Sequence, residues 1–336
     1  MLALLAIAVS AVEECPACSA LFTHTTRSPS AAPLRTAEIV VAHCFSQTLD
    51  SLRVIDAALA GASLDLRRVS IYSKCGRVPE RPTLRVPVSV SVVPNVGRND
   101  QTYAAHFAEH YDELADVVLL VKDTHFDERD KKRGGRETVR PQDFPLLLQD
   151  LNHSRNIACG RSPSSRSVWF WRENLWAFRI AGYDPTTASA NFSASAVNMG
   201  AFLQATLAPE EYSRLAAETM LPVCTGGTFL CRASSVTSVQ RETWRRLAHA
   251  LARFDNLEEG HFMERTWSAL LSPPFSTHPL AKEFLLGAAA SAPTEADRHR
   301  AAHNDKSRRK RSTRAYLGAV PHCNCSAIWS GTKLHA

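Results

Sequence analysis

The sequence predicts an α/β fold in which a mostly parallel, doubly wound sheet carries helices on both faces. Short apolar segments rich in β-branched residues are typical of strands, and continuous apolar runs are typical of strands buried on both faces. Helical segments alternate with these strands, as they do in parallel strand–helix–strand units. The expected strands are residues 38–43, 69–73, 88–93 and 117–121.

Two segments between these strands have the periodicity of amphipathic helices. The first runs from Leu49 to Leu59 and ends near Gly61. The second, expected over residues 100–115, follows a polar glycine turn, and Asn99 or Asp100 can cap its first turn. Its apolar stripe has spacings of four, four and three residues: Tyr103, Phe107, Tyr111 and Leu114.

The basic charge of the chain is concentrated in one segment. The formal net charge is +6, but residues 298–314 alone carry eight basic side chains and one acidic side chain. The rest of the chain is therefore close to neutral, which argues against binding to nucleic acid by the folded part.

The ends of the chain predict four regions and entry into the secretory pathway. We expect a signal peptide over residues 1–14, a stem over 15–36, one folded domain over 37–285 and a disordered basic tail over 286–336. The apolar run at the start is too short to span a bilayer, and no other segment predicts a transmembrane helix. Nine cysteines and sequons at Asn152, Asn191 and Asn324 fit a disulfide-bonded glycoprotein.

Polar side chains follow several of the expected strands. Asn95 and Arg98 lie in the turn after 88–93, and Asp123 and His125 follow 117–121. Ligands of open α/β sheets bind beyond the carboxyl ends of the strands, so these residues form a candidate site. Lys74 follows another strand and is a further candidate, although a lysine in such a place is most often a solvated surface residue.

The chain resembles a known family over roughly residues 39–271. The block Asn95-Val96-Gly97-Arg98, followed by Thr102-Tyr103, resembles the motif of the domain-of-unknown-function 3431 family. The later segments CTGGTFLCRASSV and EEGHFMERTW resemble the second half of that family. The family has no established activity, so this resemblance mainly implies a fold and its boundaries.

A remoter resemblance is to the GT-A glycosyltransferases, whose nucleotide-sugar domain is Rossmann-like. Asp123-Thr124-His125 resembles their D-x-H motif, which implies Mn²⁺ or Mg²⁺ bound to the donor diphosphate. Gly226-Gly227 resembles their glycine loop, and Leu257-Glu258-Glu259 resembles their acidic segment. His261 or His278 resembles their late histidine.

The resemblance implies a transferase acting on a nucleotide sugar and a glycan or other hydroxyl acceptor. Glu258 and Glu259 are the candidate general bases, because transfer to a hydroxyl needs an acceptor for its proton. Asn95, Arg98, Lys74 and the two glycines are the candidate donor-binding residues.

Two other functions fit parts of the sequence. A non-catalytic carbohydrate- or nucleotide-binding protein could keep the same fold and lack the chemistry. His106, Glu109 and His110 also match the H-x-x-E-H pattern of a zinc peptidase, in which two histidines one helical turn apart share a metal.

Overall fold

The computed structural model describes residues 33–123, 144–154, 156–159, 168–180, 192–224 and 226–274. Nearly all of these belong to one compact unit, Ser30–Pro273. The predicted signal peptide, most of the stem and the basic tail lie outside the described residues. The regions 1–14 and 286–336 therefore stay predictions.

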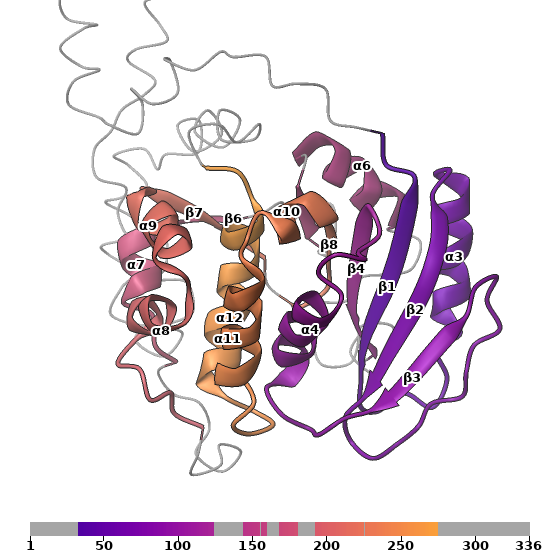
Figure 1. The fold of residues 1–336 in the computed structure, drawn as a ribbon, viewed down its shortest axis with the longest axis horizontal. Coiled ribbons are helices and arrows are strands. Elements are labelled where there is room, and N and C mark those ends of the chain that lie inside the picture. The colour runs from indigo at the N-terminus through magenta and orange to yellow at the C-terminus, as the bar shows by residue number, and fades with distance from the viewer. Residues whose placement is uncertain are drawn as a thin grey trace, which may run out of the picture. The chain divides into compact units, whose positions relative to one another are not determined.

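A six-stranded, mostly parallel sheet forms the centre of this unit, as the sequence predicts (Figure 1). Its order is β3-β2-β1-β4-β8-β5. The first four strands in that order are parallel, whereas β8 runs antiparallel to both β4 and β5. The strands are β1 (Thr36–His43), β2 (Asp65–Ser73), β3 (Val88–Val92), β4 (Val117–Lys122), β5 (Ile157–Cys159) and β8 (Phe229–Arg232).

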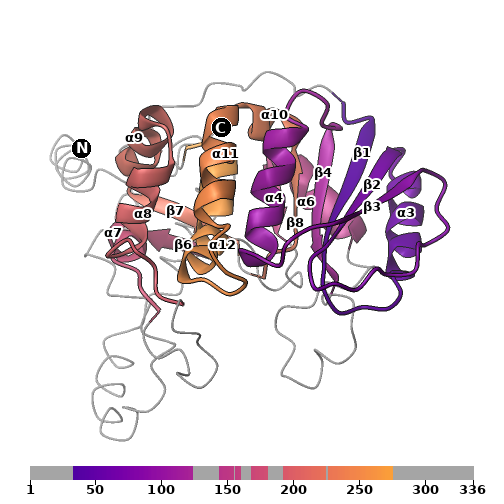
Figure 2. The ribbon, with the colours of Figure 1, turned by 60° about the horizontal axis from the view of Figure 1, so that its bottom comes forward.

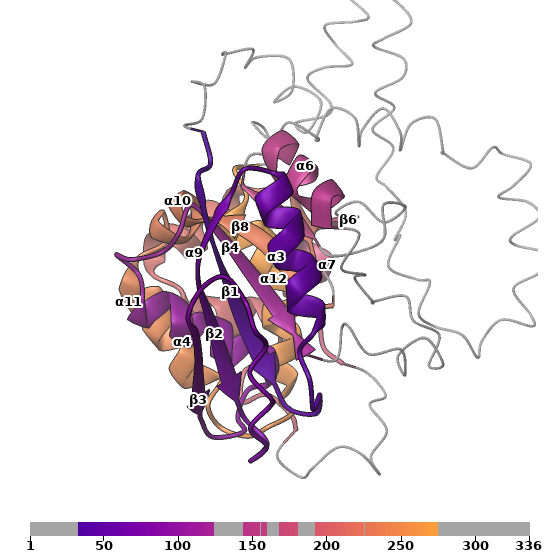
Figure 3. The same cartoon turned by 90° about the vertical axis from the view of Figure 1, so that its right-hand side faces the viewer.

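Helices cover both faces of the sheet, again as predicted. Alternate side chains of β1 contact the helices on opposite faces of the sheet, because successive side chains of a strand point to opposite sides. Val40 and Ala42 join the core that contains α4 (Arg98–Glu109), while Ile39 and Val41 join the core that contains α3 (Ser51–Gly61). Figure 3 shows α3 and α6 (Phe144–Ser154) on one side of the strands and α4 on the other.

The second half of the chain adds a helical layer beside α4 (Figure 2). Its core is aromatic: the rings of Trp244 and Trp267 stack with centroids 5.8 Å apart, and Phe107 meets both edge-on. A small antiparallel pair, β6 (Val168–Trp171) with β7 (Met220–Val223), completes the described strands. The helices are α7 (Arg172–Trp176), α8 (Met199–Thr206), α9 (Pro209–Ala217), α10 (Ala233–Thr237), α11 (Arg241–Ala250) and α12 (Glu258–Leu271).

Two disulfides link segments of the described structure. Cys44–Cys75 joins the segments that follow β1 and β2, and Cys159–Cys224 joins the end of β5 to the residue after β7. Cys231 is a free, buried thiol. In the part of the chain that the structure describes, no helix is long and apolar enough to cross a membrane.

Candidate functional site

The direction of winding in the sheet reverses beside β1. The chain passes from β1 to β2 and β3 on one side of β1, and then returns to place β4 on the other side. Such a reversal is the point at which open α/β sheets bind ligands, beyond the carboxyl ends of the strands. The segments after β1 and β4 therefore define where a site is expected.

Asp123, the residue directly after β4, clamps the segment that follows β1. Its Oδ2 accepts hydrogen bonds from the backbone amides of Cys44, Phe45 and Ser46, at 2.9, 2.6 and 2.9 Å. The side chain is only 3% exposed. Asp123 thus has a structural partner at the switch point. His125 lies outside the described residues, so the predicted metal pair Asp123 and His125 stays a prediction.

The turn before α4 has an unusual backbone. Gly97 and Arg98 both adopt left-handed conformations, with φ of 61° and 54°. Their amides donate to the carbonyl oxygens of Phe254 and Asp255, at 2.5 and 3.0 Å. A Cβ on Gly97 would clash with the carbonyl oxygen of Leu251. Glycine is therefore required at position 97, where the turn packs against the connection between α11 and α12.

The side chain of Arg98 reaches α12. Its Nη1 lies 2.8 Å from Nδ1 of His261 and 3.8 Å from Oε2 of Glu264. The other oxygen of Glu264 accepts the amide of Gly226 at 2.7 Å. The N-V-G-R turn, the glycine pair and α12, far apart in sequence, therefore meet at one place.

Charge and burial set the protonation states of this group. Burial alone would raise the pKa of Glu264, but the neighbouring His261, the charges of Arg98 and Lys122 and the Gly226 amide hold that pKa well below its usual range. Burial, together with the charge of Arg98, lowers the pKa of His261. At neutral pH the group therefore contains an ionised carboxylate beside a neutral imidazole.

Asn99 and Asp100 add buried polar atoms to the same place. Oδ1 of Asp100 accepts the indole N–H of Trp267 at 2.7 Å. Within the described residues, Oδ2 of Asp100 and Nδ2 of Asn99 have no hydrogen-bond partner, which is costly for buried groups. Burial raises the pKa of Asp100 to about 6.

Gly227 lies against Asn99 and Lys122. A Cβ there would sit 2.5 Å from Nδ2 of Asn99 and 2.5 Å from Cε of Lys122. The carbonyl oxygen of Gly227 accepts the hydroxyl of Tyr103 at 2.8 Å. With φ of 67°, Gly227 occupies the left-handed region that glycine adopts at low cost. The predicted glycine pair is thus a packed part of the cluster.

Lys74 is buried, whereas Asn95 is exposed. Lys74 is 6% exposed, and its Nζ donates to the carbonyl oxygens of Val96 and Arg98. Burial lowers its pKa to about 8. Lys74 therefore stabilises the backbone of the turn before α4, whereas the donor-binding role of Asn95 stays a prediction.

Glu258 and Glu259, the predicted catalytic acids, are each paired with an arginine. Glu258 is 1% exposed, receives two hydrogen bonds from Arg179 at 2.9 Å and accepts two backbone amides. Glu259 is 4% exposed and accepts from Arg253 at 2.9 and 3.1 Å. The acid of α12 that meets Arg98 is Glu264, less than two turns further along the helix.

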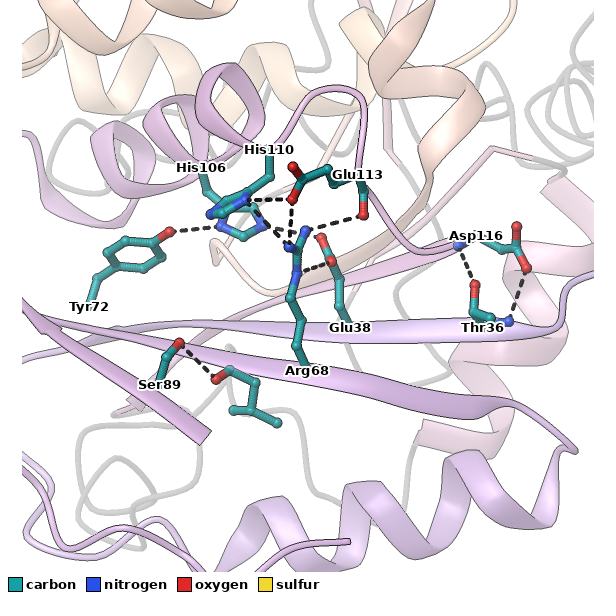
Figure 4. A network of polar contacts seen from close by, with 10 residues as sticks. Thr36, Glu38, Arg68, Tyr72, Ser89, His106, His110, Glu113 and Asp116 are labelled. Atoms are coloured by element: carbon teal, nitrogen blue, oxygen red, sulfur yellow. Dashed lines mark hydrogen bonds and ion pairs between the residues drawn. The ribbon is translucent and has the colours of Figure 1, made fainter. Parts of the chain in front are cut away.

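The H-x-x-E-H histidines belong to a buried network between the sheet and α4 (Figure 4). Nδ1 of His106 lies 2.9 Å from the hydroxyl of Tyr72, and Nε2 lies 3.1 Å from Oε1 of Glu38. Glu38 also receives a hydrogen bond from Arg68 at 2.6 Å. Both ring nitrogens of His106 are therefore engaged by protein groups and are not presented to a metal.

This network gives a direct test of the peptidase hypothesis. Glu109, the supposed base, is exposed. We expect Glu109→Gln to change the free energy of unfolding by less than about 0.5 kcal/mol, as is usual for surface substitutions. Glu38→Gln should cost more, because it weakens two charge-assisted contacts of a buried group. Equal effects in urea unfolding would contradict the structural role of Glu38. Zinc that copurifies with the wild type, together with peptide hydrolysis that Glu109→Gln abolishes, would support a peptidase.

Asp100 and Glu264 are absent from the site that the sequence predicts, although the sequence contains a signal for each. Asp100 shares the stripe of Tyr103 and Phe107, so an acid stands on the buried face of a helix. His261 and Glu264 are three residues apart and therefore share a face of α12. The residues that they contact come from distant segments, so no local pattern predicts these contacts.

Comparison with known proteins assigns no family to this chain. No protein-family model and no curated protein sequence matches this chain. Among the described residues, no group of three or more His, Cys, Asp or Glu side chains has the arrangement of a metal site. The functional argument therefore depends on the cluster itself.

Proposed function

We propose that this chain is a glycosyltransferase that moves a sugar from a nucleotide-sugar donor to a hydroxyl acceptor, with a GT-A-like fold. The observation that supports this most strongly is the meeting of Arg98, Gly226, His261 and Glu264 beside the switch point of a parallel sheet. These residues come from the three segments on which the resemblance to the domain-of-unknown-function 3431 family depends, and Gly226 and His261 also match motifs of the remoter resemblance to transferases.

The cluster contains groups suited to an anionic donor. The side chain of Arg98 is 23% exposed, and guanidinium groups form paired hydrogen bonds with phosphate oxygens. Lys122 lies beside Gly227 and supplies a second positive charge. Cations that face a departing diphosphate stabilise the negative charge that develops on it.

His261 is the candidate proton acceptor. Its Nδ1 lies 3.7 Å from Oε2 of Glu264, and its side chain is 14% exposed. Nη1 of Arg98 lies 2.8 and 3.0 Å from the two ring nitrogens of His261. Once this guanidinium binds donor phosphate in place of the ring, a neutral imidazole with a carboxylate beside it is suited to take the proton of an attacking hydroxyl. Glu264, whose pKa is held low, suits the role of orienting the imidazole and anchoring the glycine pair.

A divalent metal at Asp123 fits the described geometry poorly. Mn²⁺ and Mg²⁺ are bound mainly by oxygen atoms, and Oδ2 of Asp123 already accepts three amide hydrogen bonds. If bound with a diphosphate, such a metal would neutralise charge on the leaving group. No step of the proposed mechanism is assigned to it.

A second candidate is a non-catalytic nucleotide- or carbohydrate-binding protein with the same fold. The arginine pairing of Glu258 and Glu259 favours it, because acids held in this way are poor general bases. Binding is common to both candidates, whereas turnover distinguishes them.

A thermal-shift screen with nucleoside diphosphates, with and without Mn²⁺, tests the proposal. A nucleotide at a hundred times its Kd should raise the melting temperature by about 5 °C or more, since it binds only the native state. Arg98→Met should remove most of this shift. Arg85→Met is the control, because Arg85 pairs with Asp56 away from the cluster.

The outcomes separate the candidates. A nucleotide that binds through Arg98, with donor hydrolysis or transfer that His261→Gln abolishes, supports the transferase. Binding without hydrolysis or transfer supports the binding protein. If no nucleoside diphosphate shifts the melting temperature, the transferase and the nucleotide-binding protein are both wrong, and only a carbohydrate-binding protein is left.

A further inference from the structure

Lys74 is an unusual lysine in this fold. It directly follows β2, is 6% exposed, and places its ammonium group against two backbone carbonyl oxygens, those of Val96 and Arg98. Burial of a charge is costly unless hydrogen bonds compensate for it. The carbonyl oxygens supply that compensation, and in return the ammonium group fixes the backbone of the N-V-G-R turn.

The left-handed backbone of this turn needs such stabilising contacts. A left-handed conformation costs a non-glycine residue of order 1–2 kcal/mol, and such conformations persist only where the surroundings hold them. At Arg98 the amide donates to Asp255 while the carbonyl oxygen accepts from Lys74. The backbone of Arg98 is therefore held on both sides, by the end of β2 and by the connection before α12.

The direction of the Arg98 side chain follows from this backbone. With φ of 54°, the guanidinium reaches His261 and comes within 3.8 Å of Glu264. If the residue relaxed to a right-handed conformation, its Cα–Cβ bond would turn and the guanidinium would leave α12. A group that fixes the conformation of Arg98 therefore fixes the place at which an anion can be bound.

We propose that Lys74 is a positioning residue, which holds the left-handed Gly97–Arg98 turn so that the guanidinium of Arg98 can bind a phosphate group of the substrate. A guanidinium that is fixed in advance binds phosphate without the entropy cost of ordering a long side chain. The identity of the anion depends on the proposed function, whereas the positioning role does not. Lys74 thus acts through Arg98 and does not bind the diphosphate itself.

The test uses the full chain and two measurements. The first is the NMR titration of His261, assigned with His261→Gln, because the nearby charge of Arg98 lowers the pKa of this imidazole after the larger effect of burial. The second is binding of inorganic pyrophosphate by calorimetry. Both are made on the wild type, Lys74→Met, Arg98→Met and the double variant.

We expect Lys74→Met to raise the pKa of His261 by at least half of the change that Arg98→Met produces. It should also weaken pyrophosphate binding by about tenfold, the usual effect of losing one well-placed ionic hydrogen bond. In the double variant, loss of Lys74 should add nothing to either change. Arg85→Met, which removes a cation paired with Asp56, should leave both measurements unchanged.

Two results would overturn the proposal. The positioning role is wrong if Lys74→Met leaves the titration of His261 unchanged, or if it still shifts the titration once Arg98 is gone. The phosphate assignment, and the proposed function with it, is wrong if wild type shows the coupling but does not bind pyrophosphate. Should Lys74→Met fail to fold, Lys74→Gln keeps one donor for the carbonyl oxygens, and an intermediate effect is then expected.

Discussion

Asp123→Ala is expected to lower the free energy of unfolding by about 3 kcal/mol, because three backbone amides lose a charged acceptor and are left without a partner. The bonds in question join Asp123 to Cys44, Phe45 and Ser46. Asp123→Asn keeps an acceptor oxygen and loses the charge, so its cost should be about half as large. Urea unfolding at neutral pH measures both.

Asp116 offers a matched control for this experiment. Its carboxylate accepts the amides of Arg35 and Thr36, both at 2.9 Å, at the opposite end of β1. Asp116→Ala removes bonds of the same kind, but fewer of them and from a more exposed site, and should leave nucleotide binding intact. If Asp123→Ala is no less stable than the wild type while Mn²⁺-dependent binding is lost, Asp123 is a metal ligand and the clamp has little importance.

The sequence alone suggests that Asp123→Ala would change the free energy of unfolding little, because a polar residue directly after a strand is expected to be exposed. The structure shows why the local pattern is insufficient: the amides that bind Asp123 follow a different strand, 77 to 79 residues earlier. Sequence periodicity reports which face of an element is buried, but not which distant backbone groups meet a strand end.

The parallel half of the sheet is the part that the sequence predicts well. Its four strands are rich in β-branched residues, β4 is a nearly continuous apolar run, and α4 between β3 and β4 has a clear aromatic stripe. β5 and β8 are three and four residues long, and they pair antiparallel through contacts between distant segments. The glycine turn before Phe229 predicts a short strand there, but segments this short have no periodicity from which their direction or their neighbours in the sheet could be predicted.

For the candidate site too, the sequence predicts the local features but not the contacts between distant segments. The sequence selects Arg98 and the two glycines, because turns and glycine pairs are local features, and Glu264 links Arg98 to Gly226 in the structure. It selects Glu258 and Glu259 on α12, whereas Glu264 makes the contact with Arg98. Which side of a buried helix faces the site depends on packing against α4 and β7, and this is not encoded in the helix alone.

A pH-dependent difference in stability is expected for Asp100→Asn. The pKa of Asp100 is raised to about 6 in the folded state, from 3.8, so its favourable contribution is fully present below pH 3.8 and is lost as the pH rises through about 6. Burial is the main cause, and the nearby Glu264 adds to it, while Arg98, Lys122 and the Trp267 N–H oppose it.

Asparagine keeps an acceptor for the Trp267 N–H and cannot ionise. The stability of Asp100→Asn relative to the wild type should therefore be greater near pH 8 than near pH 4, by about 2 kcal/mol or more. Urea unfolding of both proteins at the two pH values measures this difference. An equal difference at both pH values would mean that Asp100 titrates normally, with a partner for its second oxygen.

Glu264→Gln provides a control of opposite sign. The pKa of Glu264 is held below its ordinary value of 4.5, so its stabilising contribution is present above pH 4.5 and is lost as the pH falls through the lowered pKa. This variant should therefore lose more stability near pH 8 than near pH 4, whereas Asp100→Asn gains. If the change in relative stability between pH 4 and pH 8 has opposite signs for the two variants, the cluster stabilises the ionised form of Glu264 and the neutral form of Asp100. The same sign for both would show that the pH effect comes from general charge repulsion and not from the cluster.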